Sequence, residues 1–220
     1  MPVSAPAATE AFAQNPNLAV EDFRVLARDP GIQIFVRNKR PADMIAFAPA
    51  RTVLFVHGAT YPAHTAFDFK IDGLSWMDYI AARGYDTYLL DLRGYGKSTR
   101  PKEMGQPPQD NPPIVRTDTA VKDIAAAVDF IIKRRNIPRL VLLGWSWGTF
   151  SGPAYAVANP DKVERLVLYA PIWVGMTGRL AAAAVGERLP CYRTVTREDA
   201  RVRWYRGVAE DKNISIKDRP

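Results

Sequence analysis

Short, continuous apolar runs are spaced along the middle of this chain of 220 residues. Such runs are typical of strands that are buried on both faces of a sheet. The predicted strands are Val53–Val56, Thr87–Leu90, Leu140–Leu143 and Val163–Tyr169. Two further runs, Phe23–Ala27 and Ile32–Val36, flank the turn sequence Asp29-Pro30-Gly31 and predict a hairpin.

Amphipathic segments lie between these runs. The clearest helix has apolar side chains at helical spacing from Val121 to Ile132, with Thr117 as its expected N-cap. A shorter helix is expected after Ser75, and another over Thr149–Ala158. Strands that alternate with helices predict a doubly wound, mostly parallel α/β sheet whose first strands form a hairpin.

The pattern changes after Pro171. Gly175–Val185 is small and apolar and Arg197–Arg206 is basic, and we expect both segments to be helical, with no further buried strand. The chain is therefore divided into a disordered N-terminal arm (1–20), an α/β core (21–173) and the start of a helical cap (174–220).

The composition is that of a globular domain. Hydrophobic residues make up 47% and charged residues 24% of the chain, which excludes a disordered or fibrous protein. No apolar run approaches the roughly 18 residues of a membrane span. The single cysteine, Cys191, cannot form an internal disulfide.

The net charge of +7 does not by itself indicate a nucleic-acid partner. Residues 174–220 hold ten Lys and Arg against six Asp and Glu, a net +4, which predicts a solvated basic helical face. The first residues have neither the basic nor the apolar region of a signal peptide. We expect a cytoplasmic protein, with removal of an export signal as the alternative, and neither nucleic acid nor membrane as a partner.

The strongest motif is Gly144-Trp145-Ser146-Trp147-Gly148, which follows a predicted strand and precedes a predicted helix. This is the context of a nucleophile elbow, a tight turn that lifts a serine hydroxyl above the edge of a sheet. The helix N-terminus after such a turn stabilises developing negative charge. Outside this context the pattern indicates only a glycine-rich turn.

A second motif, His57-Gly58, follows the predicted strand Val53–Val56. The loop after such a strand is where an oxyanion hole forms, and we expect its donors to be the backbone N–H groups of Ala59 and Trp147. His57 is expected to hold this loop rather than to catalyse.

Three side chains are candidates for a substrate pocket. His64, further along the same loop, either stabilises the loop or contacts substrate. The indoles of Trp145 and Trp173 favour an apolar substrate group if they line the pocket, and are core residues otherwise.

The segment Asp91-Leu92-Arg93-Gly94-Tyr95-Gly96-Lys97-Ser98 resembles two nucleotide-binding motifs and satisfies neither. A P-loop requires a glycine where this chain has Asp91, and a dinucleotide fingerprint requires a third glycine. The segment therefore predicts the end of a strand and a tight turn. We expect no cofactor and no metal.

In this order and context, the three motifs are similar to those of the α/β-hydrolase superfamily, over about Phe23 to Trp173. The resemblance implies Ser146 as nucleophile, Ala59 and Trp147 as oxyanion donors, and a helical cap after Pro171. A serine at the elbow disfavours the dehalogenase and epoxide-hydrolase branches, whose nucleophile is an aspartate.

The chain departs from that family at one point. The family order is Ser, then Asp or Glu, then His, yet no histidine follows Ser146. Asp199 and Asp211 follow no predicted strand, so neither is assigned as the acid. The explanations are a missing C-terminal part, a non-catalytic relative, and a rearranged site that uses His64.

The favoured function is a serine hydrolase that cleaves a carboxylic ester, or an amide or thioester, through an acyl-enzyme on Ser146. The base and acid are expected beyond residue 220, or on a complementary C-terminal chain. The alternatives are a non-catalytic binding protein and a carbon–carbon bond hydrolase of aromatic degradation.

Overall fold

The computed structural model describes residues 17–172 and 189–206. The chain enters the sheet through a hairpin of β1 (Leu18–Leu26) and β2 (Gln33–Pro41), which pair antiparallel. Gly31 takes a φ of +76° in the connecting turn, a conformation that favours glycine. The predicted hairpin is confirmed, but its strands are longer. Because Leu18 pairs with Pro41, β1 begins inside the segment expected to be a disordered arm.

Four parallel strands continue the sheet, as the apolar runs predict. They are β3 (Thr52–Val56), β4 (Asp86–Asp91), β5 (Leu140–Trp145) and β6 (Val163–Tyr169). Among the described residues the order across the sheet is β1-β2-β4-β3-β5-β6, with β2 antiparallel to β4. Every residue of β3 and β4 is buried. The mostly parallel α/β sheet is therefore confirmed.

The helices begin close to the predicted residues, with one correction. Ser75 caps α2 (Trp76–Ala81) in a capping box with Asp78. Thr117 is the first residue of α3 (Thr117–Arg135) and not its N-cap, because Arg116 holds the extended cap conformation and no side chain caps the helix. The other helices and 3-10 turns are α1 (Ala63–Ala66), α4 (Gly148–Ala158), α6 (Arg197–Tyr205), η2 (Pro49–Arg51), η3 (Lys102–Gly105) and η4 (Pro160–Lys162).

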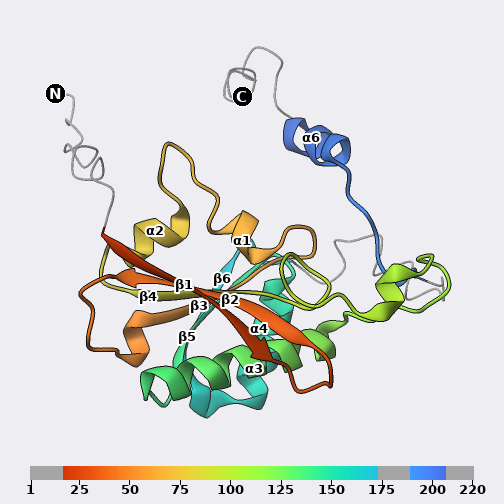
Figure 1. Ribbon diagram of the computed structural model, residues 1–220. Helices are drawn as coiled ribbons and strands as arrows, with labels where there is room; N and C mark the ends of the chain where they lie inside the picture. The colour runs from red at the N-terminus through yellow and green to blue at the C-terminus, as the bar shows by residue number, and fades with distance from the viewer. Residues whose placement is uncertain (1–16, 173–188, 207–220) are drawn as a thin grey trace.

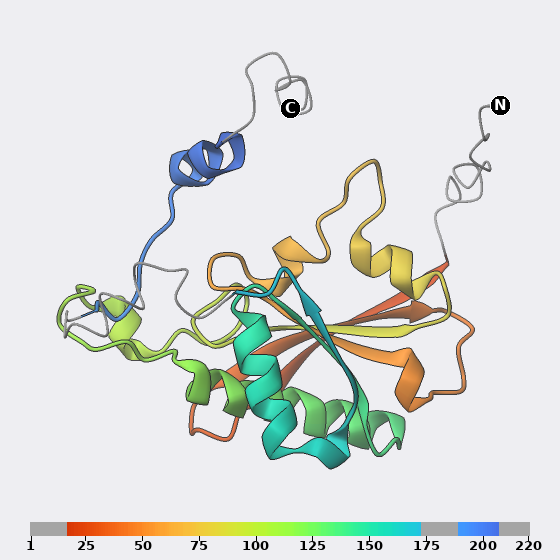
Figure 2. The ribbon, with the colours of Figure 1, turned by 180° about the vertical axis from the view of Figure 1, so that it is seen from behind.

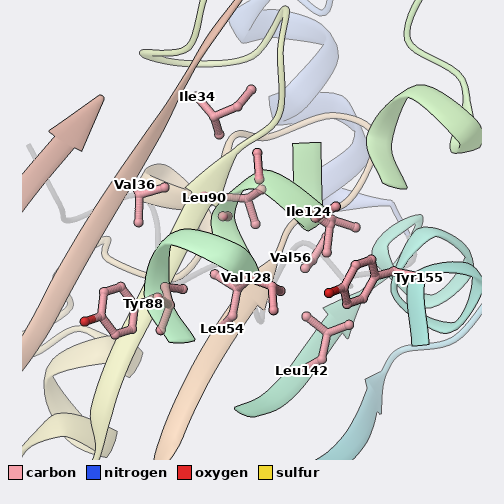
Figure 3. Close-up of a cluster of buried hydrophobic side chains, with 14 of the residues drawn as sticks. Ile34, Val36, Leu54, Val56, Tyr88, Leu90, Ile124, Val128, Leu142 and Tyr155 are labelled. Carbon is pink, nitrogen blue, oxygen red and sulfur yellow. The ribbon is translucent and has the colours of Figure 1, made fainter. Parts of the chain in front are cut away.

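Helices cover both faces of the sheet. Figures 1 and 2 show α1 and α2 on one face and α3 and α4 on the other. Between the sheet and α3 and α4 lies the larger core cluster, in which Leu54, Leu90 and Ile124 are fully buried (Figure 3). The second cluster lies under α1 and α2 and includes Phe55 and Phe67. This is the doubly wound arrangement that alternating strands and helices predict.

β6 is the last strand of the described sheet, and its apolar side chains are partly open to solvent. Val167 is 41% and Tyr169 is 51% exposed. α6 lies apart from the sheet in both views and matches the helix expected over Arg197–Arg206. The helix expected over Gly175–Val185 lies outside the described residues. In the described ranges, no helix has the length and apolarity needed to cross a membrane.

Candidate active site

Ser146 lies on the turn between β5 and α4 in a strained backbone conformation. Its φ is +54°, a left-handed value that is uncommon for a residue other than glycine. The turn is held at both ends: the Ser146 N–H donates to the carbonyl of Tyr169 at 3.1 Å, and the Thr149 hydroxyl donates to the Ser146 carbonyl at 2.6 Å. Strain that the surrounding structure maintains in this way clusters at functional sites.

The two glycines of the motif permit this turn for a steric reason. A Cβ at Gly144 would overlap the backbone of Gly148, so the strand and the helix can approach closely only without one. A Cβ at Gly148 would lie 2.5 Å from the carbonyl oxygen of Val56 on the neighbouring strand. The glycines therefore bring the start of α4 against the end of β3.

The loop after β3 reaches the serine, as the two motifs predict. β3 and β5 are adjacent parallel strands, with Val56 paired to Gly144, so both end at the same edge of the sheet. A Cβ at Gly58 would lie 2.9 Å from the Ser146 Cβ and 3.2 Å from its Oγ. Ala59 therefore follows a residue in direct contact with Ser146, and Trp147 is the N-cap residue of α4 on its other side.

His57 has both ring nitrogens engaged inside the protein. Nδ1 lies 2.6 Å from the carbonyl oxygen of Gly58, and Nε2 accepts the N–H of Leu92 at 3.1 Å. The side chain is fully buried, and this burial lowers the pKa of the imidazole below its usual 6.5. A neutral His57 thus ties the loop after β3 to the end of β4, the supporting function expected for it.

His64 is oriented by a buried carboxylate. Its Nδ1 lies 2.7 Å from Oδ2 of Asp91, which is fully buried at the end of β4. The ring packs edge-on against Phe35 of β2, at 6.2 Å between centroids. The described contacts of His64 are therefore with β4 and β2. This geometry favours the loop-stabilising interpretation of His64.

The segment from Asp91 to Ser98 is a structural turn, as its failed nucleotide motifs predict. Arg93 forms a bidentate pair with the buried Asp123 of α3 and a 2.6 Å ion pair with Asp29 of the first hairpin. A Cβ at Gly96 would overlap the Asp91 carboxyl group. The motif therefore fastens β4 to the hairpin and to α3.

The tryptophans flanking Ser146 pack against opposite faces of the sheet. Trp145 lies against the second core cluster, with its ring 6.1 Å from that of Phe67. Trp147 packs against the larger cluster. Trp173 lies outside the described residues. The contacts of Trp145 agree with the core interpretation of that residue.

The sequence reasoning missed a cavity of about 400 Å³ beside the loop after β3. It lies between the loop 94–115 and the segment 189–195, and Ala59 forms part of its wall. Arg193 reaches from that segment to the loop after β3, where its Nη2 donates to Thr60 Oγ1 at 2.8 Å. No local sequence pattern predicts this contact, because it joins residues more than 130 positions apart.

These features define an α/β protein with a strained strand-to-helix turn at Ser146. The chain belongs to the alpha/beta hydrolase fold family, whose model matches residues 51–205. Among curated proteins it is similar to a 2-hydroxy-6-oxononadienedioate/2-hydroxy-6-oxononatrienedioate hydrolase of Cupriavidus pinatubonensis (29% identity over 121 residues, 55% of this chain and 36% of the relative). It is also similar to the human (lyso)-N-acylphosphatidylethanolamine lipase (30% over 95 residues, 43% and 25%).

The matches therefore span about a quarter to a third of these relatives' length. Among solved structures, the chain resembles a laboratory-evolved variant of potato epoxide hydrolase, with a TM-score of 0.53 and 21% identity over 77% of this chain and 47% of that one. It also resembles a CIB-like hydrolase of Thermoplasma acidophilum, with a TM-score of 0.50 and 19% identity over 72% and 66%. These structural likenesses establish the shared fold alone. The family and the named relatives support a hydrolase.

Proposed function

We propose that this protein is a serine hydrolase that cleaves carboxylic esters through an acyl-enzyme on Ser146. The observation that carries the proposal is the backbone of Ser146, held at a φ of +54° on a strand-to-helix turn with Gly58 against its side chain. The serine is partly exposed at the carboxyl edge of the sheet. This is the position of a nucleophile in the family to which the chain belongs.

In the proposed reaction, Ser146 Oγ forms a bond to the ester carbonyl carbon while its proton passes to a base. The carbonyl oxygen becomes an oxyanion that the N–H groups of Ala59 and Trp147 stabilise. The tetrahedral intermediate then expels the alcohol, which takes up a proton, and leaves an acyl-enzyme. Water adds to the acyl carbon in a second step and releases the acid, which restores the serine hydroxyl.

The base is proposed to come from a histidine that these 220 residues do not contain, together with an acid that orients it. His57 is buried with both ring nitrogens engaged, and His64 is held by Asp91 at the end of β4. No histidine follows Ser146. Without a base a serine hydroxyl is a weak nucleophile, so these residues alone should retain only the residual catalysis of an oxyanion hole.

A second candidate is hydrolysis of a carbon–carbon bond. It is favoured by the similarity to the Cupriavidus hydrolase, whose name specifies an oxononadienedioate substrate. Both candidate functions require Ser146 on the same strand-to-helix turn, and they differ in the bond that is cleaved.

The proposal is tested by labelling with an activated fluorophosphonate, which reacts with nucleophilic serines. We expect label on the peptide that contains Ser146, identified by mass spectrometry, and none on the Ser146→Ala variant. Ser151→Ala is the matched control, because this buried α4 hydroxyl has no partner in the described structure. Equal labelling of the Ser146→Ala variant, or label on a different serine, would exclude the assignment.

A further inference from the structure

Two strained residues lie next to each other at the carboxyl edge of the sheet. Besides Ser146, Ala170 also has a left-handed backbone, with a φ of +48°. Ala170 follows β6 and precedes Pro171, although the residue before a proline normally takes an extended conformation. The two residues are neighbours because β5 and β6 are adjacent and parallel, with Trp145 paired to Tyr169. Strain of this kind persists only where the surrounding structure maintains it.

One buried side chain connects the two strained segments. Thr149 lies in the first turn of α4, and its hydroxyl donates to the carbonyl of Ser146 at 2.6 Å. The same hydroxyl accepts the N–H of Ile172 at 3.3 Å. A hydroxyl can donate and accept at once, so Thr149 Oγ1 joins the turn at Ser146 to the bend after β6. The N–H of Ser146, which donates to the carbonyl of Tyr169 at 3.1 Å, joins the same two segments a second time.

The helix does not need this hydroxyl for its own first turn. The Ser146 carbonyl already accepts the backbone N–H of Thr149 at 2.9 Å. What the hydroxyl adds is the bond to Ile172. The side chains of Ala170 and Pro171 are exposed, so their packing does not hold the bend. The hydrogen bond to Thr149 is therefore a contact that fixes the bend against the turn.

We propose that Thr149 is a positioning residue for Ser146. Its hydroxyl couples the turn that carries the serine to the bend at 170–172, so that Ser146 keeps its reactive position only while that bend is in place. The inference rests on the proposed function, because it names a residue that positions the same nucleophile. Thr149 acts through the backbone of Ser146 and does not touch the reacting atoms. A misplacement of about 1 Å can cost about 100-fold in rate, so a small movement of the turn is measurable.

The first test is the second-order rate of fluorophosphonate labelling at Ser146. Thr149→Val has nearly the same shape without the hydroxyl and should label about tenfold more slowly, the effect of one lost hydrogen bond. Thr149→Ser retains the hydroxyl and should restore most of the rate. Thr65→Val is the matched control: the Thr65 hydroxyl also donates to a carbonyl three residues earlier, that of Pro62 at 3.1 Å, but it joins no second strand. It should label at the rate of the unmodified chain.

The second test addresses the coupling itself. Ala170→Val adds a β-branched side chain where the backbone is left-handed, which disfavours the bend, and the side chain at this position is exposed. It should slow labelling severalfold in the unmodified chain and add nothing in the Thr149→Val variant, in which the link is already lost. Fully additive slowing in the double variant would overturn the coupling. A rate in Thr149→Ser as low as that in Thr149→Val would overturn the part assigned to the hydroxyl.

Amide hydrogen exchange, measured by NMR, gives a readout that does not depend on reactivity. Thr149→Val should speed exchange about tenfold at the N–H groups of Ser146 and Ile172, and leave the buried Ile131 of α3 unchanged. Equal acceleration at Ile131 would show a general loss of stability and overturn the inference, and so would unchanged exchange at Ile172.

The two readouts separate this inference from the proposed function. Faster exchange in Thr149→Val, in a protein whose Ser146 never labels, would keep the link between the two segments and remove the serine hydrolase. Labelling of Ser146 at the same rate in Thr149→Val as in the unmodified chain would retain the hydrolase and overturn Thr149 as a positioning residue.

Discussion

Adding one methyl group at Gly58 is expected to disable the nucleophile more than it destabilises the fold. The new Cβ of Gly58→Ala would lie 2.9 Å from the Ser146 Cβ, whereas ordinary contacts begin at 3.4 Å. The serine and the loop after β3 must therefore move apart by up to about 0.5 Å, the difference between these distances. Because a misplacement of about 1 Å can cost about 100-fold in rate, a shift of half that size should cost about tenfold.

The loss of folding stability should matter less than the loss of labelling rate. The methyl group meets one partly exposed side chain, and overpacking costs about 1–3 kcal/mol. The assay is the second-order rate of fluorophosphonate labelling at Ser146, measured by mass spectrometry well below the unfolding temperature. Gly105→Ala is the matched control, since a Cβ at Gly105 meets nothing within 4 Å. It should label at the rate of the unmodified chain.

Two results would contradict this reasoning. Labelling of Gly58→Ala within twofold of Gly105→Ala would show that the loop after β3 does not confine the serine. A loss of labelling that follows the unfolded fraction, measured by circular dichroism in the same samples, would show a folding defect rather than a displaced nucleophile.

Three further predictions follow from buried groups and from the edge of the sheet. Burial depresses the pKa of His57 below 6.5, so the folded protein keeps this imidazole neutral at a pH where the unfolded chain protonates it. The free energy of unfolding should therefore fall as the pH decreases below 6.5, by up to about 1.4 kcal/mol per pH unit, measured by urea unfolding. Asp123→Ala leaves the buried Arg93 without its bidentate partner and should cost about 3–5 kcal/mol in the same assay. Val167→Lys places a charge on the exposed strand β6 and should reduce self-association, measured by light scattering.

Each of these predictions has a matched control. His57→Gln should remove the acid dependence that His64→Gln retains, and an unchanged slope in His57→Gln would contradict the assignment. Asp129→Ala breaks two partly exposed ion pairs, with Lys162 and Arg28, and should cost about 1 kcal/mol or less, so a loss equal to that of Asp123→Ala would show that burial is unimportant. Val157 of α4 is 84% exposed, and Val157→Lys should leave association unchanged.

Much of this fold follows from local pattern. Continuous apolar runs mark β3 and β4 because both faces of these strands are buried. The apolar residues of α3 recur instead at helical spacing, which distinguishes it from the strands. The elbow is equally local, since Gly144 and Gly148 flank Ser146 within five residues between a strand and a helix. One local signal was misjudged: Thr117 has the chemistry of an N-cap but lies inside α3, because its backbone is already helical.

The arrangement of the site depends on contacts that no local pattern encodes. The sheet order places β3 beside β5 and brings Gly58 against Ser146, although 88 positions separate them in the sequence. The same long-range packing pairs His64 with Asp91. It also brings Arg193 to Thr60 in the loop after β3. The spacing of apolar residues along the sequence determines which face of a helix or strand is buried. Which segment packs against that face is decided only when distant parts of the chain come together.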